Sequence, residues 1–183
     1  MKKFALILIG ILFISANIYG QEYMTRSGYI WFYSQTPVED IKAHNRQVAC
    51  ILNTETGEVG VTLLMKSFEF KKDLMQRDFN RQYLESDKYP KATLEGKITD
   101  LSKVDFSETG KYKVPVSGKL TIHGVTNKIS TDVTLTVKED NVIAAKGMFI
   151  VSPADYDIDI PKVMRDNIAK EIEVHVDFEL KKR

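Results

Sequence analysis

Apolar and polar residues alternate over long stretches of the second half of the chain, and no other feature limits the fold as much. Residues 172–180 alternate strictly, and residues 112–122 and 129–137 follow nearly the same pattern. A period of two places the apolar side chains on one face of an extended strand and the polar ones on the other. Strands with one wet face are typical of antiparallel sheets, so this half of the chain predicts such a sheet.

The rest of the chain beyond residue 20 brings the number of strand segments to eight, joined mostly by short turns. We place these segments at residues 29–33, 47–52, 59–65, 92–98, 112–122, 129–137, 142–151 and 172–180. Eight tilted strands can close into a barrel whose interior is filled by side chains or holds one small ligand. Closure also removes exposed strand edges. We therefore predict one all-β domain over residues 21–183, folded as an eight-stranded antiparallel barrel.

Residues 71–90 form the one stretch of this region with strong helical spacing. Its apolar side chains share one face of a helix: Leu74, Met75 and Phe79. Asp73 is placed to cap the start, with Gln76 three residues later as in a capping box. We predict one short helix around residues 74–79, packed on one end of the barrel. The helix either only seals the core or also forms the wall of a cavity, and the sequence leaves both roles open.

The third strand segment changes the parity of its apolar residues just before this helix. Apolar side chains occupy odd positions up to Met65, and then even positions at Phe68 and Phe70. A change of parity within one strand indicates a bulge or a bend. We therefore expect the chain to bend at Lys66 and Ser67, which brings Met65 and Phe68 to the same side of the sheet.

Residues 1–20 carry the pattern of a secretory signal peptide. Lys2 and Lys3 precede an apolar run over residues 4–14, and small or polar residues then lead to Gly20. The run is shorter than the roughly 20 residues that a membrane-spanning helix needs. We expect this segment to be cleaved, which would leave an exported protein with no stable membrane span. Retention of the segment as an N-terminal anchor is the alternative.

Composition argues against several classes of partner and site. The chain has 26 Lys and Arg against 25 Asp and Glu, without a basic block, so we expect no nucleic-acid partner. Cys50 is the only cysteine and lies between apolar residues. An exported chain with one cysteine has no internal disulfide, and burial must hold the fold together. We expect Cys50 to be a buried strand residue and not a nucleophile.

Motifs for catalysis or metal binding are missing from the sequence. The three histidines show no metal-ligand spacing: His44, His123 and His175. His123 lies in a tight turn where its ring can bond backbone, and His175 lies on the polar face of the last strand. Asp155, Asp157 and Asp159 alternate as a solvated face and match a calcium loop poorly. We therefore expect no catalytic residue, no metal site and no cofactor.

Three segments of the chain together resemble the YceI-like family. They are residues 68–90, residues 116–126 and residues 155–158, in the family's order, and they span most of the chain after residue 20. The resemblance implies a lipocalin-like antiparallel barrel in a periplasmic or secreted protein. It also implies an elongated apolar cavity, whose ligand would be a polyisoprenoid or another long-chain amphiphilic lipid.

The chain departs from the family pattern in two places. Many members carry a histidine where this chain has Asp78. The third landmark often begins with an arginine, whereas this chain has Ser152, Pro153 and Ala154. A preference for one lipid head group therefore cannot be carried over from the family. The chain length of the ligand, and whether two chains pair as a homodimer with a longer tunnel, also stay open.

We place the cavity wall where the bent strand meets the helix and continue it along the inner faces of later strands. The candidate lipid-binding side chains are Phe68, Phe70, Leu74, Met75, Phe79, Tyr83, Leu94, Leu120 and Phe149. The first hypothesis is a binding protein that is not an enzyme. The alternatives are a lipid-modifying enzyme of the cyclase or isomerase type and a ligand-free envelope interaction or stress protein. A large apolar cavity would favour the binding protein, and a small cavity with a buried acid or base would favour the enzyme. A barrel filled by side chains would favour the ligand-free protein.

Overall fold

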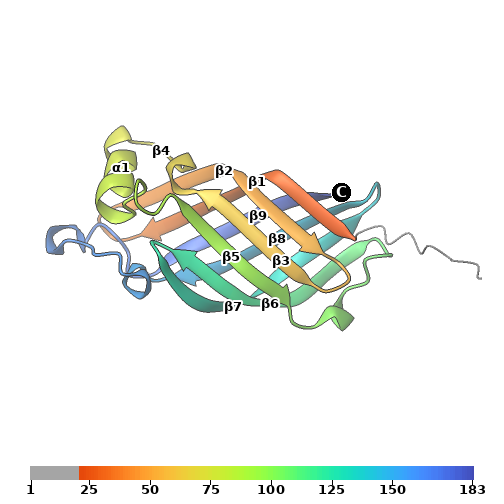
Figure 1. Cartoon of the computed structure of the whole chain (residues 1–183). Helices are drawn as coiled ribbons and strands as arrows, with labels where there is room; N and C mark the ends of the chain where they lie inside the picture. The colour runs from red at the N-terminus through yellow and green to blue at the C-terminus, as the bar shows by residue number, and fades with distance from the viewer. Residues whose placement is uncertain (1–20) are drawn as a thin grey trace, which may run out of the picture.

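A computed structural model describes residues 21–183 as one closed β-barrel with a helix at one end (Figure 1). Its barrel strands are β1 (Glu22–Gln35), β2 (Asp40–Asn53), β3 (Glu58–Leu64), β5 (Lys91–Ile98), β6 (Gly110–Ile122), β7 (Val125–Lys138), β8 (Val142–Val151) and β9 (Ile172–Lys182). They pair antiparallel in the order β1-β9-β8-β7-β6-β5-β3-β2, and β1 also pairs with β2, which closes the ring. The predicted eight-stranded antiparallel barrel is thus confirmed. The predicted signal peptide, residues 1–20, lies outside the described residues.

The first two strands begin earlier than the alternation predicts. β1 starts at Glu22, but its pairing with β2 shifts register between Thr25 and Gly28 and again before Ile30. Arg26 and Ser27 are both exposed next to each other, so the period of two is broken there. The sequence pattern therefore shows only the regular part of the strand. In contrast, β6 and β7 form one long hairpin and pair without a slip from Gly110–Val137 to Ile122–Val125.

The chain bends after β3, as the parity change predicts. A 3-10 turn, η1 (Met65–Ser67), replaces the expected bulge, and Met65 and Phe68 on either side of it are each only 5% exposed. Strand β2 then pairs with the two-residue strand β4 (Glu69–Phe70). Asn45 is fully buried at this change of partner, where its Nδ2 donates to the Leu64 carbonyl at 3.0 Å. The Asn45 side chain thus supplies a hydrogen bond to a backbone carbonyl at the point where the chain leaves the sheet.

The helix follows as α1 (Asp73–Asp78) and continues through one π-helical turn, η2 (Phe79–Tyr83). The predicted cap at Asp73 is wrong, because Lys72 holds the N-cap position and no side chain caps the helix. Gln76 instead accepts a hydrogen bond from the Phe70 N–H at 3.3 Å. Asn80 donates to the Gln76 carbonyl at 2.8 Å and accepts from the buried Ser86 hydroxyl at 2.7 Å. Contacts with the flanking chain therefore hold the two ends of the helix.

The loop between β5 and β6 lies at the other end of the barrel (Figure 1). This loop contains the short turn η3 (Leu101–Lys103), whose Leu101 packs half-buried against the core with Val104 and Phe106. The barrel therefore has one apolar plug at the η3 end and the helix at the other. In residues 21–183, the longest helix is too short to cross a bilayer.

The Gly96–Gly118 pair lets β5 and β6 approach closely, and this generates a stability prediction. A Cβ on Gly118 would lie 2.6 Å from the Glu95 carbonyl oxygen and 2.6 Å from the Gly96 Cα, which are backbone atoms that cannot rotate away. We expect Gly118→Ala to lower the free energy of unfolding by about 1–3 kcal/mol, as in overpacked cores. Urea unfolding of the purified variant measures this loss.

Gly60→Ala is the matched control within the same barrel. A Cβ there meets only the Ile51 methyl group at 3.2 Å, and this side chain can move. Because alanine costs less backbone entropy than glycine in a strand, the change should be neutral or stabilising by up to about 1 kcal/mol. Equal losses for the two variants would contradict the close approach of β5 and β6.

Candidate ligand-binding cavity

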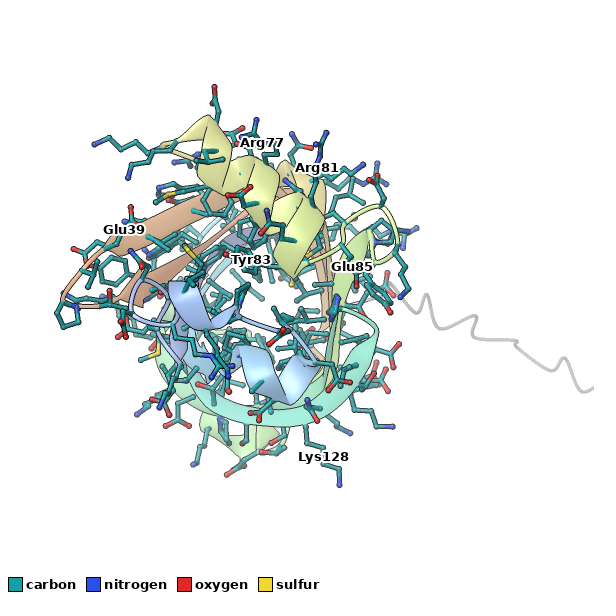
Figure 2. All side chains as sticks on the ribbon, turned by 90° about the vertical axis from the view of Figure 1, so that its left-hand side faces the viewer. Glu39, Arg77, Arg81, Tyr83, Glu85 and Lys128 are labelled. Carbon is teal, nitrogen blue, oxygen red and sulfur yellow. The ribbon has the colours of Figure 1, made fainter. Side chains whose placement is uncertain are left out.

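The barrel encloses a cavity of about 460 Å³ that reaches the surface beside the helix. Figure 2 looks onto this end, where the α1–η2 helix lies on one side of the opening and the turns η4 (Pro153–Tyr156) and η5 (Lys162–Met164) lie on the other. All eight barrel strands contribute lining side chains. The volume lies within the roughly 300–1,000 Å³ of small-molecule sites and far above a packing defect.

The alternation of each strand produces an apolar wall. On β9 every apolar position of the predicted inner face lines the cavity: Ile172, Val174, Val176, Phe178 and Leu180. Their polar neighbours, such as Glu173 and Glu179, carry ordinary ion-pair and solvent contacts on the outside. Cys50 also lines the cavity from β2, and burial raises the pKa of its thiol to about 12. The thiol is therefore neutral at physiological pH, in line with a structural role.

All nine predicted site residues line this cavity. They are Phe68, Phe70, Leu74, Met75, Phe79, Tyr83, Leu94, Leu120 and Phe149. Phe68 and Leu120 are buried in its wall, whereas Leu74 is 55% exposed at its rim. The helix thus covers the edge of the opening and does not seal the core completely. Contact of these nine side chains with a lipid stays a prediction.

The opposite side of the opening was not predicted from the sequence. Residues 153–168 supply Pro153, Ile158, Ile160, Met164 and Ile168 to the lining. Their spacing follows no single period, because two 3-10 turns and coil carry them. The available signal was a series of apolar residues within a polar, proline-containing segment. The solvated face expected for Asp155, Asp157 and Asp159 is confirmed, since all three are exposed.

Four phenylalanines attach the helix to the barrel and form the wall beside the opening. The Phe79 ring lies 4.9 Å from Phe70, 5.7 Å from Phe68 and 5.7 Å from Phe32 of β1, measured between centroids. Phe32 in turn contacts Phe68 and Phe70. Phe79 therefore joins the start of η2 to both segments of the bent strand, while one side of its ring borders the cavity.

Apart from the buried Cys50 thiol, the titratable groups that line the cavity gather at the opening. Lys72 donates to the Glu39 carboxylate at 2.7 Å, which links the start of α1 to the turn between β1 and β2. The hydrogen bond from Lys72 lowers the pKa of Glu39. Burial raises the pKa of Tyr83, and the negative charge of Asp78 raises it further. The cavity therefore has a mixed-charge opening and an apolar interior.

His123 joins the three segments that resemble the family. Its Nδ1 lies 3.1 Å from the Tyr156 carbonyl oxygen, and its Nε2 lies 3.0 Å from the Glu85 carboxylate. The ring also meets Tyr89 edge-on at 4.5 Å. His123 and Gly124 both have positive φ, so the tight turn directs the imidazole inward between the segments. The predicted structural role of His123 is confirmed, and the ring bonds a carbonyl distant in sequence.

Trp31 does not face the cavity. It lies on the outside of β1, where its ring stacks on Tyr29 and on His175 with centroids 4.9 Å away in each case. Side chains of neighbouring strands therefore cover the outer aromatic face of β1. His175 lies on the polar face of β9 as predicted, where it is half-buried in this stack and bonds Glu173. A ligand inside the barrel would not contact the Trp31 ring.

These features define a class of protein: a closed antiparallel barrel with an apolar cavity that opens at one end. Residues 31–180 match the YceI-like domain, and the chain belongs to this family. The predicted resemblance is thus confirmed. No curated protein sequence matches the chain.

Several solved structures share the fold at low sequence identity. A polyisoprenoid binding domain from Saccharophagus degradans, implicated in plant cell wall breakdown, has a TM-score of 0.77 at 17% identity, over 90% of this chain and 99% of that one. Burkholderia cenocepacia BcnA has a TM-score of 0.67 at 15% identity, over 84% and 95%. The Campylobacter jejuni YCEI protein has a TM-score of 0.58 at 16% identity, over 100% of both chains. At these identities the likeness establishes the fold alone.

Truncation of Phe79 tests its place between core and cavity. We expect Phe79→Ala to lower the free energy of unfolding by about 2 kcal/mol in ligand-free protein. This is less than the roughly 3–5 kcal/mol of a fully buried phenylalanine, because part of the ring already borders a void. Urea unfolding measures the loss, and a value of about 4 kcal/mol or more would show that Phe79 is ordinary core. Phe106→Ala is the control, since Phe106 is half-buried in the η3 plug and does not line the cavity.

Proposed function

We propose that this protein is an exported binding protein that holds one long-chain isoprenoid or similar amphiphilic lipid in its barrel. The apolar cavity of about 460 Å³ carries the proposal. Each methylene group moved from water into such a cavity contributes about 0.8 kcal/mol. A long apolar chain would therefore bind tightly without a specific polar contact. The description of the Saccharophagus degradans relative as a polyisoprenoid binding domain supports this ligand class.

The arrangement of polar groups suggests how the lipid would lie. The apolar chain would occupy the interior, and the head group would face Tyr83, Asp78 and the Glu39–Lys72 pair at the opening. Asp78 stands where many family members have a histidine. We therefore expect a head-group preference that differs from that of those members.

The same distribution favours binding over catalysis. A lipid cyclase or isomerase would need an acid or base with a shifted pKa beside the buried chain. The interior thiol of Cys50 is neutral, and the buried Ser34 hydroxyl already accepts the Ala169 N–H at 2.9 Å. The third hypothesis, a ligand-free barrel, expected an interior filled by side chains, and the large cavity argues against it.

Export remains part of the proposal and follows from the signal-peptide pattern of residues 1–20. In the periplasm or outside the cell, a carrier would allow a water-insoluble lipid to cross an aqueous space.

A cavity-filling substitution tests the proposed function. Val133 lines the cavity from β7, so a phenylalanine there would occupy space that the lipid needs. We expect Val133→Phe to weaken the binding of a long-chain isoprenoid at least about tenfold, because the smaller cavity would hold several fewer methylene groups of the lipid. Its stability without ligand should stay equal to wild type or rise. Equilibrium binding of a fluorescent polyprenol to delipidated protein measures the affinity.

Thr134→Phe is the matched control, because Thr134 is exposed on the outside of the same strand. This variant should bind the polyprenol as wild type does. Unchanged binding by Val133→Phe would show that the lipid, if it binds, lies outside the barrel. A wild-type protein that binds no long-chain lipid would end the proposal.

A further inference from the structure

Three strongly exposed apolar side chains surround the opening of the cavity. Val163 is 84% exposed, Val38 is 63% exposed and Leu74 is 55% exposed. They come from three separate segments, η5, the turn between β1 and β2, and α1, which all lie at the same end of the barrel (Figures 1 and 2). Val38 adjoins the lining residue Glu39, and Val163 adjoins the lining residue Met164. The apolar rim, defined as Val38, Leu74 and Val163, therefore lies next to residues of the cavity lining, and Leu74 is itself one of them.

The opposite end of the barrel differs. In the described residues, its turns at 54–57, 99–109 and 139–141 contain no strongly exposed large apolar side chain. The apolar residues of the longest turn, Leu101, Val104 and Phe106, pack inward as the plug. Gln21, the first described residue, also lies at that end, where its carbonyl accepts the Thr54 N–H at 3.0 Å. The apolar rim is thus specific to the open end of the cavity.

The charges around the rim are nearly balanced. The segments 36–40, 71–83 and 157–171 contain seven basic and eight acidic side chains. Some of these charges pair with each other, as Lys72 does with Glu39. A rim without a strong field of either sign does not select an anionic or a cationic partner. Its exposed side chains instead match a neutral surface that accepts apolar groups.

The chemistry of the proposed ligand points to the same kind of surface. Each methylene group that must pass through water slows the release of a lipid from a membrane about fourfold. A long isoprenoid would therefore enter the barrel rapidly only where the opening touches the lipid phase directly. Direct contact requires apolar side chains at the opening and outside the cavity, which is where Val38 and Val163 lie.

We propose that the open end of the barrel docks on the surface of a phospholipid bilayer through the apolar rim. Val38, Leu74 and Val163 enter the head-group region, and the lipid then moves between bilayer and cavity without crossing water. This inference rests on the proposed binding function. Docking needs no anionic lipid, because the charges around the rim are balanced.

Sedimentation with vesicles of phosphatidylcholine, without any ligand, tests the docking itself. The test variant is Val38→Ser with Val163→Ser, since neither residue lines the cavity. The control is Met148→Ser with Ile150→Ser, because these side chains are 45% and 46% exposed on the outer face of β8. We expect wild type and control to partition equally onto the vesicles and the test variant at least about tenfold more weakly. Equal partitioning of all three proteins, or no partitioning of wild type, would overturn the proposal.

Transfer of a dansyl-labelled farnesol from the same vesicles to the protein tests the consequence. The wild-type rate should rise with vesicle concentration, as a collision requires, and the test variant should be several-fold slower at an unchanged final occupancy. Equal rates that do not depend on vesicle concentration would overturn docking and leave the binding function intact. If wild type takes up no probe, the binding function fails, while sedimentation still decides docking.

A rim that joins two copies of the chain would give a wild-type dimer that the test variant lacks, and this too would overturn membrane docking.

Discussion

The closed ring of strands is the constraint on which the other features depend. In a closed barrel every second side chain of a strand points to the interior, and a barrel of eight strands is wide enough to leave space there. Many inner positions hold side chains of modest size, such as Ala92, Ala145 and Gly147, so the interior is not filled. Because the β1–β2 pairing closes the last edge, an apolar void can persist in water without exposing unpaired backbone. The barrel and its cavity therefore follow from the same alternation of residues.

The opening depends on contacts between segments that are far apart in the chain. Phe79 joins the helix to Phe32, Phe68 and Phe70, and His123 joins Glu85 to Tyr156. Residues of all three segments that resemble the family thus meet at the open end of the barrel.

Local patterns in the sequence predicted much of the fold and part of the site. The period of two identified the inner faces of the strands that alternate and, through its change of parity, the bend between Met65 and Phe68, because each depends on neighbouring residues. It failed at Arg26 and Ser27, where an irregular register hides the start of β1. The capping-box pattern also failed at Asp73, where Lys72 holds the N-cap position and Gln76 accepts a hydrogen bond from the Phe70 N–H instead. The segment that carries Ile160 and Met164 to the opening mixes coil with 3-10 turns, and its apolar residues follow no single period that a sequence pattern could reveal.

Native mass spectrometry of the protein purified from its own host tests the central claim most directly. The account predicts one bound lipid per chain, and extraction of that complex should release a long-chain isoprenoid or a similar amphiphile. Two results would contradict the account: protein that carries no ligand, or protein that carries a small polar molecule in the barrel. Either one counts when the protein is folded and also fails to bind added polyprenol.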